Sequence, residues 1–470
     1  MKDNLTNEKS FGRTVLSLVL PLAIQNLINV AVNGADVFML QMISETSLSA
    51  ASMAGQVYFI LTLILFGLSS GAAVLTAQYW GKRDVRTVEK VMGMTVRFAV
   101  TVSMVFFFVA FCFPRAVMSV LTDVPAVIDE GVPYLRIMAC SYPITAVTII
   151  CLNVLRTVEK VNISTAVYLL SLFTNIGLNL CFIKGWLGFP RIGIAGVAIA
   201  TVSARLLEIV ITLVYVRRRK SLVRLRFKDV FKRNKLLSKD FLRYSMPVVL
   251  NEMLWGTAIS LSATVIGHLG QEPIAAQSVA TTVRQLAMVV VFGIANATAI
   301  IVGKEIGAGR VERAKTYSRK LMRFSLAAGV CGAALMFGLH SAIPSVMGNL
   351  SDLAAEYLRF MLLAMSVYVV FSSVSATGIV GVFRAGGDTR MGLLLDVGTL
   401  WFICLPLGFL AAFVWNLDVK WVFIILISDE LLKFPIVLWR FSSMKWLNNV
   451  TRDEVTEQNK EEADEGARTA

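Results

Sequence analysis

The sequence has little charge and few residues of the kinds that enzymes use for chemistry. Charged residues make up 16% of its 470 residues, against about a quarter in soluble proteins. It has two histidines, and its six cysteines lie in apolar stretches without a Cys-x-x-Cys pair, so we expect neither a metal site nor disulfides. The phosphate-binding motif Gly-x-x-x-x-Gly-Lys-Ser/Thr is missing as well. We therefore expect no cofactor, no ATP hydrolysis and no enzymatic activity.

Apolar residues dominate instead, at 56% of the chain, and the mean hydropathy is +0.69. Charge-free runs such as Thr14–Ala35, Phe360–Phe383 and Val397–Leu417 reach the ~20 helical residues that cross about 30 Å of hydrocarbon. Helices are expected because each satisfies its own backbone hydrogen bonds in lipid. The fold class is thus an all-α polytopic membrane protein. Twelve transmembrane helices are predicted, at 15–40, 48–77, 94–113, 133–155, 161–184, 193–216, 243–267, 274–303, 321–340, 356–382, 391–414 and 419–440.

Lysine and arginine are distributed unevenly between the two sides of the predicted helices. Of the 45 basic residues, four lie in the loops that would face outward, namely Arg115, Lys184, Arg191 and Lys420. Cytoplasmic loops carry the excess of Lys and Arg in membrane proteins, so both termini are predicted on the cytoplasmic side of a cytoplasmic (inner) membrane. The net charge of +14 then reflects loop topology, and we expect no nucleic-acid binding.

The two halves of the chain repeat one another. A shift of 226 positions (247 minus 21) places Pro21 on Pro247 and the Phe-Gly pair at 66–67 on the pair at 292–293. Six helices per copy bring both copies into the membrane in the same direction, as two pseudo-symmetric six-helix bundles. This architecture favours a transporter with alternating access, although channels and membrane enzymes can also be duplicated. The predicted parts are a cytoplasmic N-terminus (1–14), two six-helix lobes (15–216 and 243–441), a basic linker (217–242) and a disordered acidic tail (442–470).

Helix one carries polar residues at membrane depth. Asn26, Asn29, Asn33 and Asp36 follow one another at spacings of three, four and three, which places them on one face of a helix. A charge at mid-membrane is costly, so the carboxylate of Asp36 needs a function or a partner. The asparagines alone fit a hydrogen-bonded seam between helices. Asp36 favours instead a cavity site that can exchange a proton.

Polar residues on two other helices could surround Asp36. Asn175 and Asn179 are four apart on helix five, and Thr201 follows on helix six, so the three could supply neutral oxygen ligands. In the second lobe, Asn251 and Glu252 lie on helix seven, and the predicted depths of Glu252 and of Arg284 on helix eight differ by several ångströms, which two long side chains can bridge. Two roles are predicted for Glu252 and Arg284. They form a structural ion pair, or they belong to a site for substrate or a proton in the second-lobe cavity.

Several other charged residues are predicted to serve structure. Arg205 and Glu208 are three apart on helix six, as are Glu430 and Lys433 on helix twelve, where Asp429 is adjacent. Such spacing allows each pair to neutralise itself. Asp396 and the stretch 384–389 are expected near cytoplasmic helix ends, where they would determine loop geometry.

Motifs in both halves resemble one transporter family. The stretches FGLSSGAAVLTAQYWGKRD, FGIANATAIIVGKEIGAGR, LNEMLWG, FRAGGDTR and LLKFPIVLWRFSSMKW, together with helix one, resemble the multidrug and toxic compound extrusion (MATE) family, and the resemblance extends to about Thr451. It implies a V-shaped pair of six-helix lobes that exports organic cations in exchange for protons or sodium. By position, Asp36 matches the coupling acid of helix one, with Asn175, Asn179 and Thr201 as its polar neighbours, and Glu252 matches the acid of helix seven.

The sequence departs from the family pattern at two places. Many relatives have a carboxylate where this chain has Asn179, and members with a sodium site in the second lobe have an acid on helix ten, whereas 360–383 has none. Proton coupling through Asp36 is therefore favoured over sodium coupling. The predicted function is secondary antiport of small organic cations by a monomer in the lipid bilayer. A flippase for lipid-linked or other amphiphilic cargo is the alternative, followed by a channel.

Overall fold

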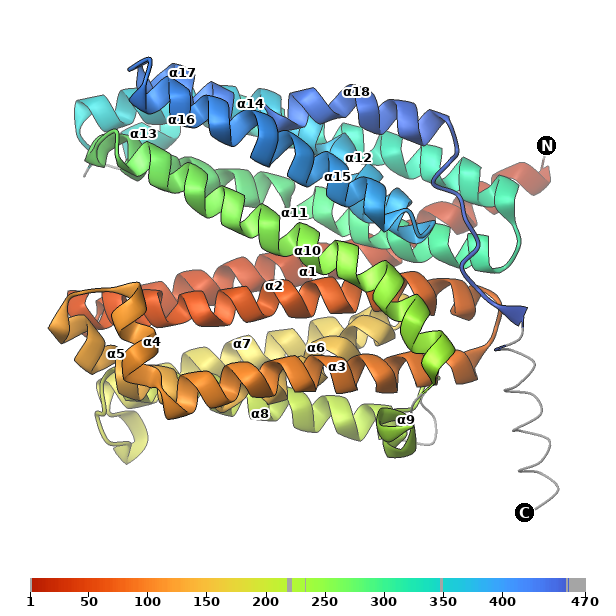
Figure 1. Cartoon of the computed structure of the whole chain (residues 1–470), viewed down its shortest axis with the longest axis horizontal. Helices are drawn as coiled ribbons and strands as arrows, with labels where there is room; N and C mark the ends of the chain where they lie inside the picture. Colours follow the sequence, from red (N-terminus) through yellow and green to blue (C-terminus); the bar gives the residue numbers. More distant parts are fainter. Residues whose placement is uncertain (1, 218–221, 233, 347–349, 454, 456–470) are drawn as a thin grey trace. The chain divides into compact units, whose positions relative to one another are not determined.

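A computed structural model describes residues 2–217, 222–232, 234–346, 350–453 and 455 (Figure 1). These residues form helices and the turns between them, with no β-strand among them. The described chain divides into two compact units. The N-terminal unit comprises Ile24–Ser245 and the described residues from Arg452 onward, and the C-terminal unit comprises the chain up to Ala23 together with Met246–Thr451.

The helices are α1 (Lys2–Gln41), α2 (Glu45–Gly81), α3 (Val85–Cys112), α4 (Pro114–Leu121), α5 (Pro125–Ala139), α6 (Ser141–Thr157), α7 (Val161–Lys184), the 3₁₀ turn η1 (Trp186–Gly188), α8 (Ile194–Arg217), α9 (Phe227–Phe231), α10 (Lys235–Gly267), α11 (Gln271–Gly307), α12 (Val311–Leu339), α13 (Ala342–Val346), α14 (Asp352–Ala376), the π-helix η2 (Thr377–Phe383), α15 (Thr389–Thr399), the π-helix η3 (Leu400–Cys404), α16 (Leu405–Phe413), α17 (Val419–Leu426) and α18 (Asp429–Ser442). The long helices overlap the predicted spans, but α1, α3, α10 and α12 begin at residues 2, 85, 235 and 311, against predicted starts at 15, 94, 243 and 321.

Ten helical stretches in the described chain are long and apolar enough to cross a membrane, and the pair α5–α6 makes an eleventh if its two parts form one span. This pair bends by 45° at Cys140, because Pro143 cannot donate a backbone hydrogen bond to Ala139 and its ring clashes with that carbonyl. The predicted last helix, 419–440, is interrupted between Leu426 and Asp429, so α17 and α18 are each too short to span alone.

Part of the predicted basic linker is folded against the N-terminal unit. The short helix α9 packs against α3, where both carboxylate oxygens of Asp229 accept hydrogen bonds from Arg86 at 2.5 and 2.7 Å. Glu89 accepts from the backbone N–H of Arg224 at 3.0 Å and pairs with Arg226 at 3.0 Å. Ion pairs between α3 and the linker thus hold the linker in place. Its residues 218–221 and 233 lie outside the described structure.

The start of the predicted disordered tail is also folded. Trp446 is fully buried in the C-terminal unit and stacks on Phe441. In the N-terminal unit, Arg452 makes a bidentate ion pair with Asp240 at 2.6 and 2.7 Å. Disorder from residue 442 onward was therefore wrong for these positions, because a large apolar ring and a paired guanidinium anchor them. Residues 454 and 456–470 lie outside the described structure.

Helix α2 approaches α10 so closely that one glycine decides the packing. A Cβ atom added at Gly71 would overlap the backbone and side chain of Ser245, whereas a Cβ at Gly55 in the same helix would meet nothing within 4 Å. We expect Gly71→Ala to lower the free energy of unfolding by about 1–3 kcal/mol through overpacking. Gly55→Ala should leave it unchanged or raise it by up to about 1 kcal/mol, because alanine favours helix. Thermal unfolding in detergent measures both, and equal melting temperatures would contradict the prediction.

Candidate functional site

Four of the predicted site residues meet in the N-terminal unit. The amide nitrogen of Asn179 donates to Asp36 Oδ1 at 3.2 Å and to Asn175 Oδ1 at 3.2 Å. The amide nitrogen of Asn175 then donates to Thr201 Oγ1 at 3.1 Å. Helices α1, α7 and α8 thus each contribute to one polar chain that ends at Asp36. The four-residue spacing on α7 directs both asparagines to the same side of the helix, as predicted.

Asn179 leaves one of its polar atoms unsatisfied. Its side chain is fully buried, and its amide oxygen has no hydrogen-bond partner. The other members of the chain are buried or half-buried, with Asn175 3% exposed and Asp36 half-buried. A buried acceptor without a donor costs free energy, so this position suits a hydrogen-bearing group that arrives during function.

Asp36 forms no ion pair within the part of the chain that the structure describes. The base whose charge acts on it is Arg205, but the Arg205 guanidinium pairs with Glu208 at 2.6 Å. That intrahelical pair is the one expected from the sequence, and it leaves Asp36 with a neutral amide as its hydrogen-bond partner. The carboxylate is therefore not locked to a cation.

Asn26 and Asn29 of α1 form no described hydrogen bond to this chain. Asn26 is half-buried with an unpartnered amide nitrogen, and Asn29 is exposed. The side chain of Asn33 lies outside the described structure. Sequence reasoning overlooked Gln25, which is 2% exposed and donates to Thr165 Oγ1 at 2.7 Å. Its position beside Asn26, within the polar run of helix one, was the signal.

Aromatic residues of the N-terminal unit were also not singled out. The rings of Tyr58 and Tyr142 stack with centroids 5.9 Å apart, and Tyr134 lies within electrostatic range of both Tyr58 and Asp36. Aromatic faces attract cations and apolar surfaces. No spacing in the sequence distinguishes these three tyrosines from core residues, which is why only the tertiary structure reveals them.

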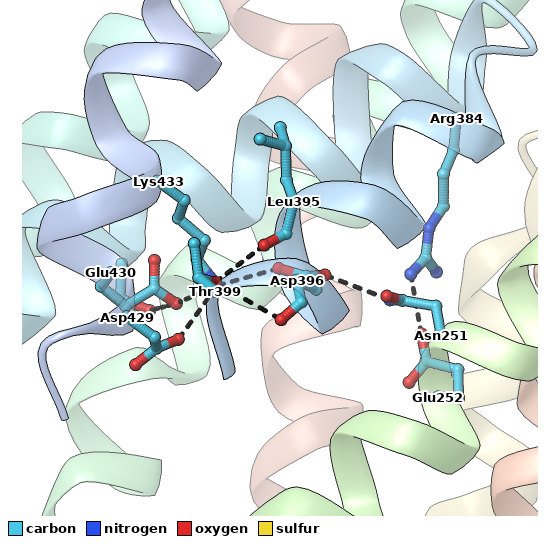
Figure 2. Close-up of polar contacts among 10 residues, drawn as sticks. Asn251, Glu252, Arg384, Leu395, Asp396, Thr399, Asp429, Glu430 and Lys433 are labelled. Atoms are coloured by element: carbon cyan, nitrogen blue, oxygen red, sulfur yellow. Dashed lines mark hydrogen bonds and ion pairs between the residues drawn. The ribbon is translucent and has the colours of Figure 1, made fainter. Parts of the chain in front are cut away.

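Glu252 is paired in the C-terminal unit, but with a different arginine from the one predicted. Arg384 Nη2 donates to Glu252 Oε1 at 2.7 Å (Figure 2). The Arg284 guanidinium instead lies 5.6 Å from the ring centroid of Tyr368. Of the two alternatives predicted for Glu252 and Arg284, the ion pair was therefore wrong. Arg384 directly follows the π-helix η2 and is 4% exposed, and residues 386–388 form the turn before α15, at a helix end as expected for the stretch 384–389.

A second charged group surrounds Lys433, and we call Asp396, Asp429, Glu430 and Lys433 the Lys433 cluster (Figure 2). Lys433 Nζ lies 2.8 Å from Asp396 Oδ1, 3.2 Å from Asp429 Oδ2 and 3.1 Å from Glu430 Oε1. The amide nitrogen of Asn251 donates to Asp396 Oδ2 at 3.1 Å. The role in loop geometry expected for Asp396 was wrong, because α15 turns this acid toward α18.

A narrow pocket adjoins these groups. Its lining comes from α10, η2 and the start of α15 and comprises Val248, Asn251, Ile379, Arg384, Thr389, Gly392 and Leu393. Two buried oxygens of this lining have no hydrogen-bond partner, Asn251 Oδ1 and Thr389 Oγ1. In the described residues, no three His, Cys, Asp or Glu side chains are arranged to hold a metal ion.

Comparisons with known proteins agree on one family over nearly the whole chain. The MatE family model matches residues 21–181 and 247–410, one segment in each repeat. The chain is similar to the uncharacterized transporter YisQ of Bacillus subtilis (22% identity over 451 residues, 94% of this chain and 96% of the relative). It is also similar to the probable multidrug resistance protein NorM of Bacillus cereus (26% identity over 421 residues, 88% and 90%).

Solved structures share the fold. A crystal structure of MATE in the straight conformation superposes with a TM-score of 0.83 at 18% identity, covering 92% of this chain and 96% of that one. A MOP superfamily transporter from Pyrococcus furiosus, whose structure is described as having a binding pocket of reverse polarity, matches with the same TM-score, identity and coverage. The all-helical fold predicted from the sequence is confirmed. The chain is thus a multi-pass membrane protein rather than an enzyme, and it belongs to the multidrug and toxic compound extrusion (MATE) family of transporters.

Proposed function

We propose that this transporter exports cationic amphiphilic compounds in exchange for protons and that Asp36 is the group that binds the coupling proton. The hydrogen bond from the neutral Asn179 amide to Asp36 carries the proposal, together with the pairing of Arg205 to Glu208. An acid that is half-buried and not held by a base can change its protonation state at modest cost. A permanently paired carboxylate could not.

Asn179 supports a proton as the exchanged ion. Its buried oxygen has no donor while Asp36 accepts from its nitrogen. A half-turn of the amide interchanges oxygen and nitrogen, so a protonated Asp36 could donate to that oxygen. The same side chain can therefore satisfy both states of the acid. In the C-terminal unit, the Arg384 guanidinium occupies one oxygen of Glu252, which disfavours Glu252 as a sodium ligand.

The proposed cargo follows from charge and aromatic surface. An ionised Asp36 attracts a positively charged compound, and the half-buried ring of Tyr58, backed by the buried ring of Tyr142, adds apolar and cation–π contact. Protonation of Asp36 from the outside removes the attraction and releases the cargo. Because the related NorM of Bacillus cereus is named a probable multidrug resistance protein, drug-like organic cations are the first compounds to test. We propose a monomer in the inner membrane with both termini cytoplasmic, from the distribution of Lys and Arg.

The test separates the driving ions. Inverted vesicles from cells that produce the protein are energised by respiration, and uptake of a fluorescent organic cation is followed. Collapsing the pH gradient with an ionophore should abolish accumulation, whereas collapsing the sodium gradient should leave it unchanged. Vesicles without the protein are the control.

Three outcomes contradict the proposal. Loss of transport when only the sodium gradient is collapsed would indicate sodium coupling. Cargo-independent single-channel currents in planar bilayers would indicate a channel. Movement of fluorescent lipid analogues between leaflets, without cation transport, would indicate a flippase.

A further inference from the structure

The Lys433 cluster contains more acid than its lysine can balance. Asp396, Asp429, Glu430 and Lys433 are each less than 9% exposed, and one ammonium faces three carboxylates. An uncompensated charge in a protein interior costs several kcal/mol. With every acid ionised, the cluster would carry a net charge of −2 (three negative charges less one positive).

Neighbouring charges do not remove this excess. Glu252 and Arg384 balance one another, and Arg284 lies over the ring of Tyr368, which is within electrostatic range of Asp429 and Glu430. Neutral neighbours among the described residues include the Cys404 thiol and the Ser372 hydroxyl, which donates to Glu430 Oε1 at 3.3 Å. Even when the neighbouring charged residues are included, there are more acids than bases. The carboxylates are then four (Asp396, Asp429, Glu430 and Glu252) and the cations three (Lys433, Arg384 and Arg284). At least one negative charge remains.

A metal ion cannot supply the missing positive charge where the carboxylates converge. Lys433 Nζ already lies at that point, within 3.2 Å of one oxygen from each acid. Figure 2 shows the lysine side chain directed between Asp396 and the pair Asp429–Glu430. A proton needs no such space, because it adds to a carboxylate oxygen directly.

The hydrogen bonds indicate which acids hold the proton. Both oxygens of Asp396 accept hydrogen bonds, one from Lys433 and one from Asn251, and such donors favour the ionised form. Glu430 Oε2 is buried without a partner, a poor environment for a charged oxygen. Asp429 and Glu430 are adjacent residues whose carboxylates both contact the Lys433 ammonium, so a proton on either one lowers the excess negative charge.

We propose that the Asp429–Glu430 pair binds an exchangeable proton, which makes the Lys433 cluster a second proton site, in the C-terminal unit. Asn251, which donates to Asp396, also lines the narrow pocket, and in that lining its amide oxygen and the Thr389 hydroxyl have no hydrogen-bond partner. The site is separate from Asp36 and does not depend on the function proposed for that residue.

Infrared difference spectroscopy of the purified full-length protein tests this assignment. A protonated carboxylic acid has a C=O stretch that is absent from carboxylates and shifts in D₂O. We expect this band near neutral pH in the wild type, and we expect it to disappear as the pH is raised while the protein stays folded. Glu430→Gln and Asp429→Asn should each remove it or reduce it by about half, because the pair shares one proton. Both variants are tested in case one fails to fold.

Two matched variants make the result specific. Glu208→Gln removes a buried glutamate paired with Arg205 in the N-terminal unit and should leave the band unchanged. Asp36→Asn should remove any band of its own and leave the Glu430-sensitive band in place. A Glu430-sensitive band that does not titrate, or a band insensitive to both Glu430→Gln and Asp429→Asn, would overturn the second site. Loss of the band with Asp36→Asn alone would also overturn it, while leaving the proposed function intact.

Discussion

Replacing Asp36 by asparagine is expected to abolish uphill transport of organic cations while leaving the protein folded. Exchange of one proton for one monovalent cation is electroneutral, so the pH gradient alone drives it. A difference of one pH unit is worth about 1.4 kcal/mol, or a tenfold cation gradient. The amide of the Asp36→Asn variant can still accept the hydrogen bond from Asn179 but cannot carry the proton. The accumulation ratio should therefore fall from about ten per pH unit to about one.

Proteoliposomes with an imposed pH gradient measure this effect. Asp129→Asn is a matched control, because Asp129 is exposed and pairs with Arg115 at 3.2 Å at the surface; this variant should transport like the wild type. Equilibrium binding of the cation and the melting temperature of Asp36→Asn show whether the variant is folded. Undiminished accumulation by Asp36→Asn would exclude this acid as the coupling site.

Among the substitutions considered for this protein, replacing Lys433 by methionine is expected to lower the free energy of unfolding most. Methionine fills a similar volume but leaves Asp396, Asp429 and Glu430 without the ammonium that contacts all three. Breaking a buried ion pair by removing one partner costs about 3–5 kcal/mol, and here further proton uptake by the acids would offset part of it. The unfolding free energy should therefore fall most at high pH, where the carboxylates resist protonation.

A double variant distinguishes charge imbalance from lost packing. Lys433→Met combined with Asp396→Asn removes one negative charge and keeps the amide able to contact Asn251, so stability should recover partly. Lys315→Met is the control, since its pair with Glu312 lies on the helix surface and such pairs contribute about 0–1 kcal/mol. If Lys433→Met unfolds no more easily than Lys315→Met, the cluster is not held by this lysine.

The polar chain around Asp36 was largely predictable. Asn175 and Asn179 share a helix face because they are four residues apart. Asn179 donates a hydrogen bond to Asp36 and another to Asn175, so both belong to the polar chain that ends at Asp36. The long helices were likewise predicted from the length of the uncharged stretches of sequence, because a segment that crosses lipid must satisfy its own backbone hydrogen bonds. The bend at Cys140 was not predicted, although Pro143 in the sequence indicates a break in the helix at this point. No proline marks the interruption between α17 and α18 in the same way.

The charged groups of the second half were not predictable in the same way. Glu252 and its partner Arg384 are 132 positions apart, and Asn251 and Asp396 are 145 positions apart. Local spacing pairs residues on one helix, as for Arg205 and Glu208. It does not indicate which of several buried bases an acid will meet on another helix.

The sequence by itself determined that this chain is helical, lies in a membrane, is duplicated, and carries an isolated acid on its first helix. These properties depend on composition and on periodicity within single helices. Only the tertiary structure decided that Arg384, and not Arg284, pairs with Glu252, and that three acids converge on Lys433. The rotation and depth of packed helices decide such contacts, and those are properties of the whole C-terminal unit rather than of any local stretch of residues.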